Sequence, residues 1–431
     1  MTLEATLERR LHRAVADRLT DRLRSDGDMS VDDERALTRE LIAVELAALA
    51  ESAYGDNRTP LDSTSERELS DAVFARLWGL GRLQIYVDDP DLANVHVNGF
   101  DNVWLVYRDG TKVRGQPVAD SDQELVETVA AAARRLGRTE KRWDKVSWEL
   151  HLQLPGGERL HGVLGLTGRP VITIRRHDFS LHRLSHLVNL DVIDEGLAEF
   201  LAAAVRAKLN LIVAGGTNTG KTTMLRCLLN EVPPTERVVT VEDNLELGLD
   251  RFTDLHPDHV CWERRGANVE GHGEATLADC VRATLRQNPD RVIVGEIRGV
   301  EVVDMLRAMS QGNDGSMSSI HADSSKGALV RLGMYTAEAG LDEETSNKWI
   351  ANAVDLIVHL GWVDGVRRVT SVREVLEAEA RQVATNEVYR LGGDGHPAPT
   401  PGPAIRDDTL TRLTAAGFDP AHLSSPLAGR W

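Results

Sequence analysis

The sequence predicts an α/β protein whose main domain is a parallel β-sheet covered by helices on both faces. In the second half of the chain, helical segments alternate with short, almost wholly apolar runs, at residues 209–213, 238–241, 292–294 and 356–358. Such runs are typical of parallel strands that are buried on both faces. Residues 362–366 are predicted to form a hairpin at the edge of this sheet. In the first half, alternating apolar and polar residues follow an opening helical pattern, which predicts a smaller α+β domain behind a helical region.

The opening region, residues 1–79, is predicted to be helical. Apolar residues recur with helical spacing over residues 3–23, and a second helix is predicted over about 32–53. Ser63 and Glu66 have the spacing of a capping box, which predicts a third helix beginning there.

Residues 80–178 are predicted to form the small α+β domain. Apolar residues alternate with polar ones over 95–107, and Asp109-Gly110 supplies a hairpin turn. A helix is predicted over about 122–136, and a β-branched strand over 171–174.

Composition limits the classes of function. The 431 residues leave room for two or three domains. With 50 Lys and Arg against 67 Asp and Glu, the net charge of −17 argues against broad, nonspecific binding of nucleic acid. No stretch reaches the roughly 18 apolar residues of a membrane span, so we expect any membrane role to run through a partner.

The three cysteines, Cys227, Cys261 and Cys280, show no CxxC spacing and no accompanying histidine pattern. They predict neither a disulfide framework nor a zinc site, and they fit a reducing compartment. The first residues mix acids and bases without the apolar core of a secretion signal, so we expect a cytoplasmic protein.

A phosphate-binding loop is the strongest motif. Residues 215–222 fit G-x4-G-K-[ST] and stand between an apolar strand and a helical run. Backbone N–H groups and Lys221 are expected to hold phosphates, and Thr222 to coordinate Mg²⁺. Asn218 takes a position often held by glycine, and asparagine tolerates a positive φ. The predicted nucleotide-binding residues are Gly215, Gly216, Thr217, Asn218, Thr219, Gly220, Lys221, Thr222 and Thr223.

Two further apolar strands end at carboxylates, one at Glu242 and Asp243 and the other at Glu296. The carboxyl ends of parallel strands share one edge of a sheet, so we expect these groups beside the phosphates. One would polarise the attacking water and another position Mg²⁺, directly or through water. Helix capping is the alternative for Asp243 or Glu246. Arg298 is expected to pair with Glu296.

From about Gly81 to Val375 the chain resembles the secretion ATPase superfamily, which powers type II secretion, type IV pili and type IV secretion. Four motif regions stand in that family's order, at residues 215–222, 241–247, 285–298 and 312–322. The segments at residues 97–99 and 173–176 look like the CpaF/TadA branch, the tight-adherence pilus motor.

The resemblance implies a RecA-like P-loop ATPase domain at residues 179–391, with a PAS-like small domain before it. It implies a homo-hexamer in which ATP and Mg²⁺ lie between the two domains and hydrolysis moves one against the other. The work is delivered to an integral membrane platform protein, so the protein would be held at the cytoplasmic membrane through partners. No sequence-specific nucleic acid is expected. Residues 392–431 are predicted to be a linker and a tail, because residues 392–403 are rich in glycine and proline. Within this tail, a short terminal helix is predicted over residues 410–427.

The resemblance also assigns roles to residues. Glu242 and Glu296 match the acidic-box and Walker B glutamates, and His321 matches the His-box histidine. Either Arg175 or Arg176 would reach the phosphates from the smaller domain; the equally good alternative is a solvated strand end.

Asn313 stands where the His box usually has a second histidine. Asparagine cannot become cationic, so sensing of the γ-phosphate there is expected to be weaker or slower.

The predicted function is therefore a hexameric motor that hydrolyses Mg-ATP to energise pilus assembly or protein secretion. The first alternative is a conjugation-type ATPase of type IV secretion. The second is an assembly scaffold that binds nucleotide with weak turnover, which Asn313 keeps open. A small-molecule kinase is disfavoured, since the sequence has no arginine-rich lid.

Overall fold

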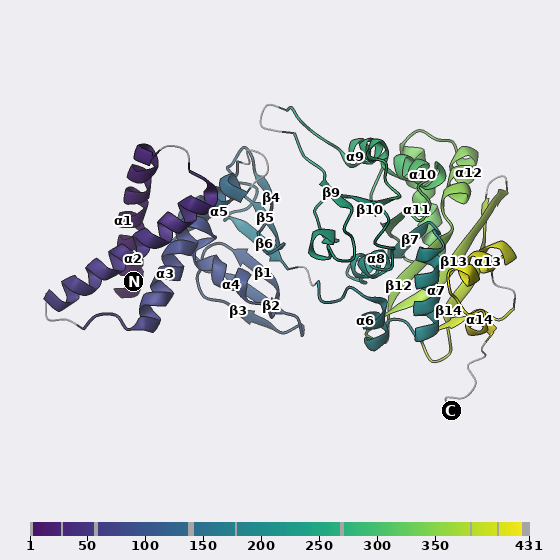
Figure 1. Ribbon diagram of the computed structural model, residues 1–431, viewed down its shortest axis with the longest axis horizontal. Coiled ribbons are helices and arrows are strands. Elements are labelled where there is room, and N and C mark those ends of the chain that lie inside the picture. Colours follow the sequence, from purple (N-terminus) through teal and green to yellow (C-terminus); the bar gives the residue numbers. More distant parts are fainter. Residues whose placement is uncertain are drawn as a thin grey trace. The chain divides into compact units, whose positions relative to one another are not determined.

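The computed structural model (Figure 1) describes residues 3–26, 29–55, 59–136, 142–176, 179–267, 271–379, 382–402 and 405–424. The chain divides into two compact units, residues 1–177 and 178–431. Each unit buries hydrophobic clusters of its own, as independent domains do.

The first unit begins with three packed helices, α1 (Leu3–Asp26), α2 (Val31–Gly55) and α3 (Ser63–Trp78). Residues such as Val15, Ile42 and Val73 form their shared core. The Asp62 carboxylate caps α3 by accepting a hydrogen bond from the Ser65 backbone N–H. The predicted cap at Ser63 is therefore wrong. Asp62 is the N-cap, because it has both the extended backbone and the side-chain acceptor that a cap needs.

A six-stranded antiparallel sheet completes this unit, in the order β3-β2-β1-β6-β5-β4. Alternate residues such as Val95, Leu150 and Ile172 join a core with Val129 of α5, and the intervening residues form a polar face. The elements are η1 (Gly81–Leu83), α4 (Gln84–Asp88), β1 (Leu92–Asn98), β2 (Val103–Tyr107), β3 (Lys112–Arg114), α5 (Asp122–Leu136), β4 (Glu149–Gln153), β5 (Arg159–Val163) and β6 (Val171–Arg175).

The second unit is built on a nine-stranded sheet in the order β15-β14-β13-β12-β7-β11-β10-β8-β9. The neighbours from β12 to β9 are parallel, which confirms the predicted parallel sheet. The strands are β7 (Leu211–Gly215), β8 (Val238–Glu242), β9 (His259–Glu263), β10 (Arg291–Ile297), β11 (Met317–His321), β12 (Leu356–Val363), β13 (Val366–Glu379), β14 (Gln382–Leu391) and β15 (Pro397–Pro399).

Helices cover both faces of this sheet. In β7, Leu211 and Val213 join the core that contains α7 and α8, whereas Ile212 and Ala214 join the core that contains α10 and α11. An uninterrupted apolar strand is therefore buried on both sides. The helices are α6 (Leu184–Asn189), α7 (Glu195–Arg206), α8 (Lys221–Leu229), η2 (Leu249–Arg251), α9 (Leu277–Thr284), η3 (Leu285–Gln287), α10 (Val302–Ser310), α11 (Ser325–Glu338), α12 (Glu343–Ala353), α13 (Asp407–Ala415) and α14 (Ala421–Ser424).

The chain after β12 differs from the sequence prediction. A hairpin does turn at Asp364-Gly365, but it is not at the edge of the sheet, because β13 goes on to pair with β14, and β14 with β15. β15 lies inside the segment predicted to be a linker. Leu413 and Phe418 are buried in the core beside α7, so this part of the tail is packed rather than solvated. Residues 425–427 of the predicted terminal helix lie outside the described residues.

Candidate functional site

The glycine-rich loop connects β7 to α8 at the carboxyl edge of the parallel strands. Asn218 (φ 61°) and Gly220 (φ 97°) have left-handed backbone conformations. The prediction that Asn218 accepts a positive φ is confirmed. These conformations turn the chain into α8, whose first-turn N–H groups lack helical partners and so suit an anion.

Gly215 has no room for a side chain. A Cβ there would lie 2.5 Å from Thr219 Oγ1 and 2.7 Å from the carbonyl oxygen of Leu360 in β12. Thr219 Oγ1 in turn donates a hydrogen bond to the Gly216 carbonyl at 3.0 Å. The shape of the loop therefore depends on glycine at its first position.

Lys221 folds back over the loop. Its Nζ donates to the Gly216 carbonyl at 2.9 Å and lies 3.4 Å from the ring nitrogens of His321. Burial lowers the pKa of Lys221, and the nearby Glu296 carboxylate opposes the shift. The ammonium therefore stands at the loop, where a phosphate would replace its carbonyl partner.

Glu296 of β10, His321 of β11 and Lys221 at the start of α8 form a chain of contacts. His321 Nε2 lies 2.9 Å from Glu296 Oε1, and the same imidazole contacts Lys221. Burial, followed by the charge of Lys221, lowers the pKa of His321. The three predicted residues meet because β10, β11 and β7 are adjacent, parallel strands.

Arg298 joins the carboxyl ends of β8 and β10. Its Nε donates to Glu296 Oε2 at 2.6 Å, and its Nη1 donates to Asp243 Oδ2 at 3.1 Å. The predicted pairing of Arg298 with Glu296 is confirmed. Asp243 also pairs with Arg264. The capping alternative is wrong for Asp243, because the residues after it form a turn rather than a helix.

Glu242 is directed into the protein. Its side chain is 2% exposed, and Oε2 accepts hydrogen bonds from the backbone N–H groups of Glu246 at 2.8 Å and Leu247 at 2.9 Å. Burial raises the pKa of Glu242 to about 8 despite these bonds. Gly295 makes room for this side chain, since a Cβ there would lie 3.1 Å from Glu242 Cγ. Glu242 thus shapes the turn after β8, and its catalytic role stays a prediction.

The residues fit a nucleotide with Mg²⁺. Gly215 and Gly220 shape a loop of the kind that cradles phosphates, and Thr222 and Thr223 stand half-buried in the first turn of α8. The Thr222 hydroxyl and the Glu296 carboxylate are the hard oxygen donors that Mg²⁺ prefers. Thr217 is exposed on the loop.

Arg175 ends β6 in the first unit, and Arg176 follows it. Arg176 donates to the Val87 carbonyl and lies 3.5 Å from Glu158, which is 4% exposed. Arg176 is therefore held within its own unit, whereas the Arg175 side chain is exposed. A role for either residue in binding phosphate stays a prediction.

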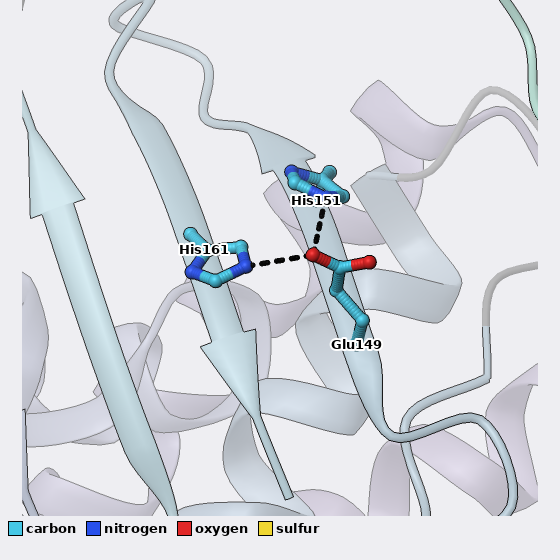
Figure 2. Close-up of side chains that lie close together, drawn as sticks. All are labelled: Glu149, His151 and His161. Carbon is cyan, nitrogen blue, oxygen red and sulfur yellow. Dashed lines mark hydrogen bonds and ion pairs between the residues drawn. The ribbon is translucent and has the colours of Figure 1, made fainter.

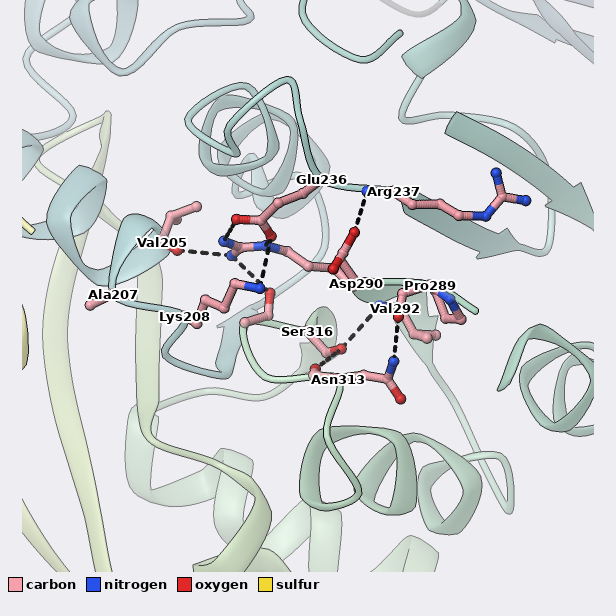
Figure 3. A network of polar contacts seen from close by, with 12 residues as sticks. Val205, Ala207, Lys208, Glu236, Arg237, Pro289, Asp290, Val292, Asn313 and Ser316 are labelled. Atoms are coloured by element: carbon pink, nitrogen blue, oxygen red, sulfur yellow. Dashed lines mark hydrogen bonds and ion pairs between the residues drawn. The ribbon is translucent and has the colours of Figure 1, made fainter. Parts of the chain in front are cut away.

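Asn313 lies beside Pro289 and Ser316 (Figure 3). It precedes β11, whereas His321 ends that strand, so the two residues stand at opposite edges of the sheet. Asn313 Nδ2 donates to the Pro289 carbonyl at 2.6 Å, and Ser316 Oγ donates to the Asn313 carbonyl at 2.6 Å. Within the chain, Asn313 therefore ties together the amino ends of β10 and β11.

Arg367 of β13 is a loop contact that sequence reasoning missed. Its Nε donates to the Asn218 carbonyl at 3.1 Å, and its Nη2 donates to Asn218 Oδ1 at 3.3 Å. The guanidinium also lies over the Trp362 ring, 4.9 Å from its centroid. No motif marks this arginine; the only sequence signal is its place in the hairpin after β12.

Within the ranges that the structure describes, no helix is both long and apolar enough to cross a membrane. The family model described as "Type II/IV secretion system protein" matches residues 157–390.

Individual relatives are similar to this chain over longer stretches than the family model. The chain is 26% identical to the crystallised VirB11 ATPase of the Brucella suis type IV secretion system, covering 68% of this chain and 92% of that one, with a TM-score of 0.36. It is 30% identical to the type IV secretion system protein PtlH of Bordetella pertussis, over 74% of this chain and 96% of that protein. A Mycobacterium tuberculosis protein named "Putative conjugal transfer protein" is 35% identical, over 71% of this chain and 87% of its own length. Because the family model matches more than half of the chain, and the PtlH and Mycobacterium tuberculosis relatives are at least 30% identical, the chain belongs to the type II/IV secretion system protein family.

Proposed function

We propose that this chain, an ATPase of the type II/IV secretion system protein family, hydrolyses Mg-ATP to drive the assembly of a pilus or the export of protein. The observation that carries the proposal is the contact chain from Lys221 through His321 to Glu296 at the mouth of the glycine-rich loop. The His321 imidazole lies between the Lys221 ammonium and the Glu296 carboxylate. The γ-phosphate would therefore have a cation to bind it, and the attacking water would have a carboxylate to orient it.

Each residue has a distinct part in this proposal. Lys221 exchanges the Gly216 carbonyl for phosphate oxygens and stabilises their charge. Glu296 orients the attacking water. His321 contacts both Glu296 and Lys221, so phosphate binding at the loop can change the position of the Glu296 carboxylate. Thr222 would hold Mg²⁺ directly and Glu296 would reach it through water; when bound, the ion would neutralise phosphate charge.

Glu242 and Arg298 act as positioning residues. Glu242 fixes the turn that carries Asp243 by accepting two backbone hydrogen bonds. Arg298 ties Asp243 to Glu296 and so fixes the direction of the Glu296 carboxylate. Arg367 is a further candidate contact to nucleotide, because it already touches the loop at Asn218.

Membership of the family also leads us to propose the domain roles and a ring of six chains. In this proposal residues 179–391 are a RecA-like motor domain, residues 80–178 a PAS-like domain, and six chains form a ring at the cytoplasmic side of the membrane. The ring acts on an integral membrane platform protein of a secretion or pilus system. The CpaF/TadA-like tight-adherence branch is the specific pilus system that we favour.

Two observations favour alternatives. The Mycobacterium tuberculosis relative, whose name refers to conjugal transfer, supports a conjugation-type ATPase of type IV secretion. The contacts of Glu296 support a scaffold with weak turnover. Its two carboxylate oxygens contact His321 and Arg298, so neither is left free for the attacking water.

The deciding experiment measures ATP turnover per chain against protein concentration, together with the mass of the assembly in the same buffer. A ring motor gives turnover that rises as hexamers form. Nucleotide binding with no turnover, in assembled as in unassembled protein, would favour the scaffold or a motor that turns over only with its membrane partner.

A further inference from the structure

A cluster of side chains of the types that bind metals lies on one face of the six-stranded sheet in the first unit. It consists of Glu149 and His151 from β4 and His161 from β5 (Figure 2). His151 and His161 are register partners, and Glu149 stands two residues before His151 and so on the same face. Two neighbouring strands therefore present three donors side by side.

The three donor atoms converge. Glu149 Oε1 lies 3.1 Å from His151 Nε2 and 3.1 Å from His161 Nε2. All three donor atoms lie within 4.8 Å of one another. In a tetrahedral zinc site with bonds of about 2.0–2.1 Å, donor atoms are roughly 3.3 Å apart. Only a small movement of the two imidazoles would make the geometry match.

Access also suits a cation. The side chains are 36–40% exposed, so an ion can enter from solvent. Arg159, on the same strand as His161, adds positive charge nearby and weakens the attraction.

We propose that Glu149, His151 and His161 form a binding site for a divalent transition-metal ion, with Zn²⁺ as the ion that best fits two imidazoles and one carboxylate. Mg²⁺ and Ca²⁺ are disfavoured because they prefer all-oxygen shells. Three protein ligands leave one position of a tetrahedral shell for water.

The site would join two strands at the edge of the sheet. β4 is the last strand in the order, and it pairs only with β5 among the described strands. A metal ion held by both strands would fasten this edge, so binding should raise the thermal stability of the folded chain.

The test uses the full chain without an affinity tag, stripped of metal and free of nucleotide. Zn²⁺ is titrated against a chromophoric chelator into the wild type, His161→Ala and Glu149→Gln. The matched control is His96→Ala, because His96 lies on the same face in β1 and is related to His161 through their shared register partner Thr173. Circular dichroism verifies that each variant is folded.

We expect one Zn²⁺ per wild-type chain, at least about tenfold weaker binding in His161→Ala and Glu149→Gln, and binding within about twofold of wild type in His96→Ala. Co²⁺ loaded in place of Zn²⁺ should show a tetrahedral visible spectrum without a thiolate charge-transfer band. Equal affinity in the wild type and in folded His161→Ala or Glu149→Gln would overturn the proposal. So would a thiolate band, which would place the ion at a cysteine, or an equal loss in His96→Ala. Because no readout depends on ATP turnover, failure here leaves the motor proposal untouched.

Discussion

His321 Nε2 lies 2.9 Å from Glu296 Oε1, and this contact joins the carboxyl ends of two neighbouring strands. The same imidazole reaches Lys221 at the start of α8. A change at the phosphate loop can therefore reach the carboxylate on β10 through one side chain.

Lys221→Ala should abolish tight ATP binding, because it removes the cation that would meet the phosphates. We expect the dissociation constant of a fluorescent ATP analogue to rise by about 100-fold or more. The melting temperature should hardly fall, since burial of the ammonium is itself unfavourable. Lys348→Ala is the matched control, because Lys348 pairs with Glu344 on the exposed surface of α12. This variant should bind ATP like the wild type.

Glu296→Gln should separate binding from turnover. The amide keeps an acceptor for Arg298 but cannot take a proton from water, so kcat should fall by about 100-fold or more while the nucleotide dissociation constant changes by less than about threefold. Single-turnover hydrolysis and equilibrium binding measure the two quantities. Glu344→Gln provides the surface control, and wild-type turnover by Glu296→Gln would refute the assigned role.

Glu242→Gln should flatten the dependence of stability on pH. The ordinary carboxyl pKa near 4.5 is raised to about 8 in the folded chain, so between these values the folded state binds more protons than the unfolded state. The contribution of Glu242 is therefore complete below about pH 4.5 and is lost as pH rises to 8, at up to about 1.4 kcal/mol per pH unit. Urea unfolding at pH 5.5 and 8 should show a larger loss in the wild type than in the variant. An equal loss in both proteins would contradict the shift.

Gly215→Ala should distort the loop and destabilise the second unit. Its Cβ would meet Thr219 Oγ1 at 2.5 Å and the Leu360 carbonyl at 2.7 Å, which predicts a cost of about 1–3 kcal/mol and weaker nucleotide binding. Gly216→Ala is the stability control, because its Cβ would lie 3.7 Å from Thr219 Cγ2, an ordinary contact. Thermal unfolding followed by circular dichroism compares the two variants, and equal melting temperatures would count against the steric argument.

Much of the main sheet could be predicted because its strands are continuous apolar runs, and the signal does not depend on what they pair with. The helix at residues 122–136 was predicted with its observed bounds, since its apolar periodicity and its ends are local. β15 could not be predicted, because its composition resembles a linker and its place is fixed only by pairing with β14.

The site divides in the same way. The loop and the order of the acidic strands follow from sequence, but the fates of Glu242 and Glu296 do not. Both residues follow apolar strands, yet one is buried against the next turn and the other reaches His321. Arg367 contacts Asn218 from a hairpin that is distant in sequence. Local sequence patterns cannot predict such a contact.

The space that Gly295 leaves for Glu242 Cγ links two positions that are distant in the chain. A Cβ at residue 295 would lie 3.1 Å from Glu242 Cγ, a tight contact that requires the Glu242 side chain to shift by a few tenths of an ångström. Alanine at 295 should therefore be accepted only as far as Glu242 can move while it keeps its hydrogen bonds from the Glu246 and Leu247 N–H groups. The two positions should therefore be treated as a single unit of variation when the sheet is redesigned.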